Sequence, residues 1–135
     1  MKDVLTNKAA QIQRCINRVH EDYDNAKNDF NDNFTVQDAV ILNIQRACEA
    51  SIDMATYICK EKKLGIPESS RDAFTMLVNA KIIPSDLAEE LKKMVSFRNL
   101  AIHNYTEINL EIVRAIIEHK LEELNRFSES VIKAA

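Results

Sequence analysis

The sequence is poor in residues that turn or break the backbone, since its 135 residues include one Gly, two Pro and no Trp. Sandwiches, barrels and nucleotide-binding loops need many tight turns, and turns depend on residues such as Gly and Pro. This scarcity excludes those classes and favours long helices. A chain of this length fits one domain, so any active site lies on one small core or between copies of it.

Excess basic charge is also missing. The chain has 18 Lys and Arg residues and 21 Asp and Glu residues, which gives a net charge of -3. Proteins that capture nucleic acid broadly usually present a basic surface, so any contact with nucleic acid must be local. The three cysteines, Cys15, Cys48 and Cys59, are an odd number without a C-x-x-C pair. They predict neither a disulfide framework nor a zinc site.

Long apolar runs are absent too. No stretch approaches the roughly 20 apolar residues of a membrane-spanning helix, and the first residues lack the apolar segment of a signal peptide. Together with unpaired cysteines, this predicts a cytoplasmic protein with no membrane partner. No cluster of potential ligands has metal-binding spacing, so we expect neither a metal nor another cofactor.

Apolar residues recur at steps of three and four through most of the chain. The pattern predicts an all-α protein, an antiparallel bundle of four long helices plus one short helix, in a single domain over residues 1–135. The predicted stripes are Leu5, Ala9, Ile12, Ile16, Val19 and Tyr23; Ala39, Val40, Ile44, Ala47, Cys48, Ser51, Ile52, Ala55 and Cys59; Phe74, Leu77 and Val78; Leu87, Leu91, Met94, Val95, Arg98 and Ile102; and Val113, Ile116, Ile117, Leu121, Leu124 and Phe127.

Local signals mark where these helices begin and end. In chain order they are a capping box formed by Thr35 and Asp38, a break at Leu64-Gly65-Ile66-Pro67, a cap at Ser69 or Ser70, a restart at Pro84 and Ser85, and a cap at Asn109.

The most informative stretch ends the fourth predicted helix and reads R-N-x-x-x-H-x-Y from Arg98 to Tyr105. Moving a proton at neutral pH needs a group with a pKa near neutrality, and histidine is suited to that task. Stabilising charge on a phosphate needs a fixed cation, which a guanidinium supplies through two parallel donors. His103 and Arg98 have these abilities.

This pattern resembles the signature of HEPN domains, in which an Arg, a polar residue and a His after four intervening positions form an RNase site. Residues 50–55 and 65–69 are also similar to segments of the HepT branch, so the resemblance covers roughly residues 35–124. It implies the HEPN fold and a metal-independent endoribonuclease toxin of a type VII toxin-antitoxin system. Arg98 and His103 would be catalytic and Asn99 supporting, and attack by the 2′-hydroxyl would leave a 2′,3′-cyclic phosphate.

The resemblance also implies partners and a regulatory site. HepT-like toxins form homodimers whose cleft contains both copies of the motif, and an MNT-type nucleotidyltransferase antitoxin neutralises them. The tyrosine that follows the motif, Tyr105 here, would accept AMP from that antitoxin. The expected partners are therefore RNA, a second copy of the chain and the antitoxin.

Helix geometry constrains the pair. Residues five apart on one continuous helix differ by about 140° in direction and by about 7.5 Å in rise, so Arg98 and His103 would point different ways. Either the helix breaks before His103, or the two groups converge only when two chains meet.

Each candidate also has a purely structural interpretation. His103 could interact with the helix dipole, Asn99 could cap the helix end, and Tyr105 could be a core aromatic. Glu49 and Asp53, one turn apart, either form a solvated face or hold Arg98 in position.

Two other functions stay open. The chain could be a non-catalytic HEPN-like binding subunit of a nucleotidyltransferase complex, or a helical dimer in which the motif is structural. Lys92 and Lys93 either are solvated or supply a local contact with RNA.

Overall fold

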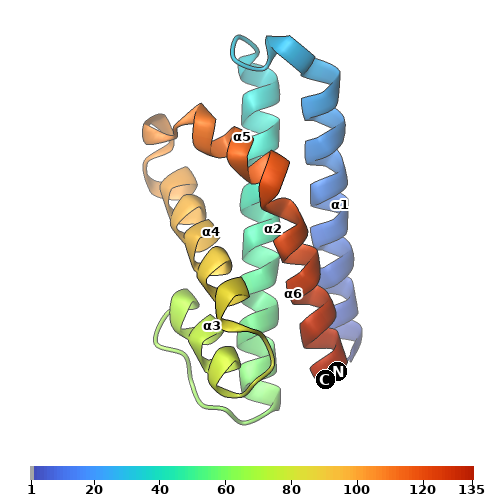
Figure 1. Ribbon diagram of the computed structural model, residues 1–135, viewed down its shortest axis with the longest axis vertical. Coiled ribbons are helices and arrows are strands. Elements are labelled where there is room, and N and C mark those ends of the chain that lie inside the picture. The colour runs from blue at the N-terminus through green and yellow to red at the C-terminus, as the bar shows by residue number, and fades with distance from the viewer. Residues whose placement is uncertain (1) are drawn as a thin grey trace.

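The computed structural model describes residues 2–135, and within that range it contains helices and no strands. Two long antiparallel helices, α1 (Lys2–Ala26) and α2 (Phe34–Glu61), lie side by side (Figure 1). The later helices are α3 (Ser70–Asn79), α4 (Ser85–His103), α5 (Leu110–His119) and α6 (Leu121–Ala134), with 3₁₀ turns at Lys27–Asp29 and Tyr105–Glu107. The predicted all-α class and antiparallel bundle are confirmed.

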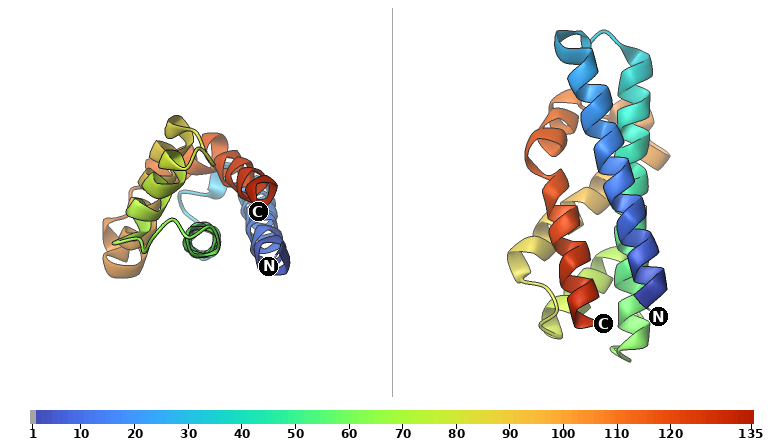
Figure 2. Two further views of the ribbon diagram at one scale, coloured as in Figure 1. Left: turned by 90° about the horizontal axis from the view of Figure 1, so that it is seen from below. Right: turned by 90° about the vertical axis from the view of Figure 1, so that its right-hand side faces the viewer.

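Helix α2 is the centre of the bundle, since it contacts α1, α3, α4 and α6. Seen from below, it lies between α3 and α4 on one side and α1 and α6 on the other (Figure 2). The side of α2 that none of these helices covers carries exposed residues. They recur at helical spacing: Asp38, Leu42, Arg46 and Asp53, with half-buried Glu49 between the last two. This exposed side of α2 separates α1 from α4.

Aromatic and small side chains fill the core around α2. The rings of Phe74 on α3 and Phe127 on α6 meet edge to face, with centroids 5.4 Å apart, a favoured arrangement for aromatic pairs. Cys48 and Cys59 are buried on α2, and all three cysteines are free thiols. Burial raises the pKa of Cys48 to about 12, so its thiol stays neutral.

Two of the predicted caps are confirmed. The Ser69 side chain accepts a hydrogen bond from the Asp72 N–H at 3.0 Å, and Asn109 accepts one from the Glu111 N–H at 2.7 Å. These caps satisfy donors that the first turn of a helix leaves without partners.

The capping box at Thr35 and Asp38 is wrong. Helix α2 begins at Phe34, and the Asn33 side chain caps it by accepting from the Val36 N–H at 3.1 Å. Asn is among the best N-cap residues, and its position leaves Thr35 already inside the first turn. The Asp38 carboxylate is then available for a partner outside the helix.

The last predicted helix is two helices, which corrects the count to six α-helices in residues 2–135. The chain bends at Lys120, whose φ of -120° is not helical. Helix α5 crosses the upper part of the bundle and α6 runs down beside α1 (Figure 1), and buried residues from both helices reach the core. The apolar spacing continues through Lys120, so the sequence carries no signal of the bend.

The C-terminal end of α4 leaves the core. Leu91 and Met94 are buried, Arg98 is half-buried, and Ile102 is 42% exposed. The prediction that Ile102 continues the core-facing stripe is therefore wrong. The motif lies where α4 passes from the core to the surface.

No helix among residues 2–135 has the length and apolar content to cross a membrane.

Candidate active site

Arg98 and His103 belong to one unbroken helix. Helix α4 continues through His103 and ends at Asn104, whose N–H donates to the Leu100 carbonyl at 2.8 Å. A break before His103, one of the two arrangements considered above, is therefore wrong. The two side chains differ by about 140° in direction, and His103 is exposed while Arg98 is half-buried. Within one chain the continuous helix therefore holds the two side chains in different directions.

Arg98 is fixed at one end of its guanidinium. Its Nη2 donates to the Ser70 hydroxyl in the first turn of α3 at 3.3 Å. Arg71, which follows Ser70 in the sequence, donates to the Ser96 hydroxyl on α4. These bonds tie α3 to α4 around the motif. The Nε of Arg98 is buried and has no hydrogen-bond partner among the described residues. The guanidinium is therefore held in place by Ser70 and has one buried donor without a partner in the described part of the chain.

A hollow of about 360 Å³ adjoins Arg98 between α1, α2 and α4. It is lined by Gln11, Glu49, Ala50, Ile52, Asp53 and Arg98. The fold thus brings both predicted orienting carboxylates, Glu49 and Asp53, to the neighbourhood of Arg98. Neither forms an ion pair with Arg98 within residues 2–135, and Asp53 instead pairs with Lys8 of α1 at 3.0 Å.

Tyr105 lies in the 3₁₀ turn after α4 and is 43% exposed, so it is not a core aromatic. Its hydroxyl donates a hydrogen bond to Asp38 of α2. Partial burial, followed by this bond and the charge of Asp38, raises the pKa of Tyr105 to about 12. The phenol is therefore protonated at neutral pH, with a carboxylate in position to receive its proton.

The remaining candidates make fewer contacts. Asn99 is half-buried, and neither Asn99 nor His103 has a side-chain hydrogen bond in the part of the chain that the structure describes. Lys92 and Lys93 lie 3.5 and 3.6 Å from Glu89 and Glu90 of the same helix. These carboxylates partly neutralise the two lysines, which favours the alternative that they are solvated.

Two residues next to the motif were not predicted as part of the site. Ser70 holds Arg98 from 28 positions away, and Asp38 holds Tyr105 from 67 positions away. Both carried a sequence signal of another kind, as candidate helix caps. Nothing in the local sequence indicates which distant side chain they bind.

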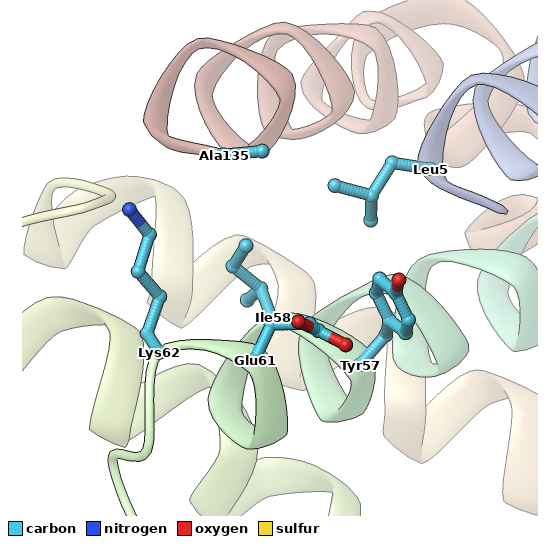
Figure 3. Close-up of a pocket in the computed structure, with 6 residues that line it drawn as sticks. All are labelled: Leu5, Tyr57, Ile58, Glu61, Lys62 and Ala135. Carbon is cyan, nitrogen blue, oxygen red and sulfur yellow. The ribbon is translucent and has the colours of Figure 1, made fainter. Parts of the chain in front are cut away.

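A separate pocket of about 120 Å³ lies near the ends of α1, α2 and α6, at the other end of α2 from Asp38 (Figure 3). Its lining residues are Leu5, Tyr57, Ile58, Glu61, Lys62 and Ala135. It is mainly apolar and contains no residue of the motif, so it does not extend the site.

The chain is similar to known proteins over most of its length. The family model "Ribonuclease HepT-like" matches residues 12–131. The mRNA nuclease HepT of Shewanella oneidensis is 48% identical over 134 residues, which cover 99% of each chain. A putative RNase of Archaeoglobus fulgidus is 29% identical over 92 residues, covering 68% of this chain and 69% of that one.

Solved structures extend the likeness to three dimensions. A tri-AMPylated HEPN toxin of Shewanella oneidensis, in complex with an MNT antitoxin, is 48% identical with a TM-score of 0.93 and coverage of 100% of both chains. A toxin-antitoxin structure with AMP-PNP is 46% identical with a TM-score of 0.91, covering 97% of this chain and 99% of that one. The chain has the HEPN fold and belongs to the ribonuclease HepT-like family.

Proposed function

We propose that this chain, as a single domain over residues 1–135, is a metal-independent endoribonuclease toxin of a type VII toxin-antitoxin system. An MNT-type nucleotidyltransferase antitoxin neutralises it by transferring AMP to Tyr105. The observation that carries the proposal is Arg98, whose guanidinium is anchored to Ser70 and retains a buried donor beside an open hollow. The names of its relatives, a nuclease and an AMPylated toxin, support the nuclease activity and the neutralisation by AMP.

In the proposed cleavage His103 takes the proton of the ribose 2′-hydroxyl. The 2′-oxygen attacks the adjacent phosphorus, the bond from phosphorus to the 5′-oxygen breaks, and the protonated imidazole of His103 returns its proton to the leaving 5′-oxygen. The products are a 2′,3′-cyclic phosphate and a 5′-hydroxyl. Arg98 stabilises charge on the non-bridging oxygens, and the half-buried Asn99 supports this contact. The donor set favours chemistry without a metal, because residues 2–135 contain no group of three or more His, Cys, Asp or Glu side chains arranged to hold an ion.

The working unit in this proposal is a two-fold homodimer. The unbroken α4 sends Arg98 and His103 in different directions, whereas a two-fold axis beside the motif allows Arg98 of one chain to meet His103 of the other. Two exposed apolar side chains, Leu42 on α2 at 41% and Ile102 on α4 at 42%, support a contact surface near the motif. Glu49 and Asp53 would then help to orient Arg98 within the shared groove.

Neutralisation uses the bond between Tyr105 and Asp38. The phenol oxygen attacks the α-phosphorus of ATP held by the antitoxin, the bond between the α- and β-phosphates breaks, and pyrophosphate leaves. Asp38 receives the phenol proton, which is needed because the pKa of Tyr105 is raised to about 12. The attached AMP adds bulk and negative charge two residues from His103, so it excludes and repels RNA.

The test is cleavage of purified RNA by the wild-type chain and by two matched variants. His103→Ala should lower the rate by about 100-fold or more, the range expected for losing a general acid-base group. His119→Ala removes another exposed histidine from the end of α5 and should leave the rate unchanged. Wild-type cleavage should also persist in EDTA and leave cyclic phosphate ends.

Equal cleavage by the wild-type and His103→Ala proteins would contradict the catalytic assignment. Absence of cleavage by the wild-type chain, with AMP transfer intact, would favour the non-catalytic binding subunit. Loss of cleavage in EDTA, with recovery on adding Mg²⁺, would mean that the chemistry depends on a metal.

A further inference from the structure

Three arginines gather between α1 and α2. Arg14 and Arg18 lie one turn apart on α1, and Arg46 lies on α2. They surround a polar hollow of about 400 Å³ whose other lining residues are Gln11, Cys15 and Asn43. No carboxylate lines it, so three positive charges meet on a chain whose net charge is -3.

These arginines differ from the others in having no side-chain partner among the described residues. The sequence contains seven arginines. Four bond to other side chains, namely Arg71 to Ser96, Arg98 to Ser70, Arg114 to Tyr23 and Asn31, and Arg126 to Glu123. Arg14, Arg18 and Arg46 form no ion pair and no side-chain hydrogen bond within the described residues, and all three are exposed.

This arrangement is unfavourable for the chain alone. Like charges four residues apart on a helix, as Arg14 and Arg18 are, destabilise it. The buried Cys15 does not offset the charge, because burial raises the pKa of its thiol, although Arg14 and Arg46 lower it. An anion that binds all three guanidinium groups would relieve their mutual repulsion.

The hollow between the arginines continues towards the candidate active site. Gln11 lines both this hollow and the hollow beside Arg98. Arg46 precedes Glu49, which lines the second hollow, by about one helical turn on α2. From Arg46 to Asp53 the exposed side of α2 extends by about 10 Å at the helical rise. A single strand of a few nucleotides is therefore long enough to occupy the hollow at Arg46 and the hollow beside Arg98 together.

We infer that Arg14, Arg18 and Arg46 form a phosphate-binding extension of the RNase groove, which holds the backbone of single-stranded RNA on its way to Arg98 and His103. This inference rests on the proposed function. Guanidinium groups pair with phosphate oxygens through two donors at once, and such contacts position nucleic acid without reading its sequence. The extension gives an acidic protein the local attraction for RNA that its net charge does not provide.

The test measures binding of a labelled oligouridine, longer than the roughly 4–16 nucleotides of common single-strand sites, by fluorescence anisotropy over a range of salt. A His103→Ala background prevents cleavage. Replacing Arg14, Arg18 and Arg46 together by Ala should raise Kd by about tenfold or more at 0.1 M salt. It should also make the slope of log K against log salt shallower by about 2, since each single-strand phosphate contact contributes about 0.7. Replacing them by Lys should largely retain the slope.

A matched control replaces Lys60, Lys62 and Lys133 by Gln. These exposed residues lie towards the ends of α2 and α6, so the control removes the same charge elsewhere and should leave Kd and the slope close to their starting values. In the cleaving protein, the triple Ala variant should raise KM for RNA and leave kcat unchanged. Circular dichroism verifies that every variant is folded.

Unchanged Kd and slope in the triple Ala variant, with normal cleavage by the wild-type protein, would overturn this inference and leave the proposed function standing. Equal losses in the control would assign the effect to overall charge and overturn it as well. Loss of the homodimer or of the antitoxin complex, with RNA affinity intact, would make the arginines a protein interface. Failure of the wild-type protein to bind or cleave RNA would instead remove the proposed function.

Discussion

The hydroxyl of Tyr105 donates a hydrogen bond to the carboxylate of Asp38, which joins the turn after α4 to the start of α2 across 67 positions of the chain. The bond fixes a half-exposed tyrosine two residues beyond His103. It also places the Asp38 carboxylate where it can accept the proton of the Tyr105 phenol. The same contact therefore connects the fold, the proposed site of AMP attachment and the pH behaviour of the chain.

Tyr105→Phe should remain toxic and escape silencing by the antitoxin. The phenylalanine ring retains the packing and loses only the oxygen that accepts AMP. Growth assays with and without the antitoxin test toxicity. Mass spectrometry after incubation with antitoxin and ATP should show one or more added AMP units on the wild-type peptide that contains Tyr105 and none on the variant. Silenced toxin with an unmodified Tyr105 would favour inhibition by protein contact alone.

Asp38→Asn should bring the pKa of Tyr105 down from about 12 towards its ordinary value of 10 and should slow AMP transfer. The carboxylate raises the pKa by accepting the phenol hydrogen bond and by its charge, while burial is the larger cause and stays. Ultraviolet titration, with Tyr105→Phe subtracted, measures the change. Asp53→Asn, which removes another exposed carboxylate of α2, is the matched control and should alter neither quantity.

The raised pKa of Tyr105 also predicts how stability depends on alkaline pH. The folded chain holds the phenol proton more tightly than the unfolded chain, so this contribution is complete below pH 10 and is lost as the pH rises from 10 through about 12. The free energy of unfolding should therefore fall more steeply over this range in the wild-type chain than in Tyr105→Phe. Parallel urea titrations at several pH values measure both slopes, and identical slopes would contradict the raised pKa of Tyr105.

Ser69 and Ser70 are neighbours with separable roles. Ser69→Ala removes the cap of α3 and should lower the free energy of unfolding by about 1 kcal/mol, with little effect on the rate of RNA cleavage. Ser70→Ala removes the partner of Arg98 and should lower the rate by roughly 2- to 10-fold, the value of one net hydrogen bond. Chemical denaturation and cleavage assays on both variants give the comparison. A reversal of the two effects would mean that Ser70 does not position Arg98.

How much the sequence predicts depends on the range of the interaction. The caps at Ser69 and Asn109 follow from contacts within three residues, and the apolar stripes follow from helical periodicity. The bend at Lys120 could not be predicted, because the stripe passes through it unchanged and tertiary packing decides the direction of α6. The contacts of Arg98 with Ser70 and of Tyr105 with Asp38 depend on how helices distant in sequence pack together. The motif indicated the chemistry, and the fold was needed to identify what holds its residues.

The most direct test of a site shared between two chains is to mix Arg98→Ala chains with His103→Ala chains. Neither variant alone should cleave RNA. If Arg98 of one chain acts with His103 of the other, each mixed dimer regains one complete pair, and random exchange in an equal mixture should restore about a quarter of wild-type activity. Native mass spectrometry confirms that mixed dimers form. Proven mixed dimers without any RNA cleavage would contradict a shared pair of Arg98 and His103.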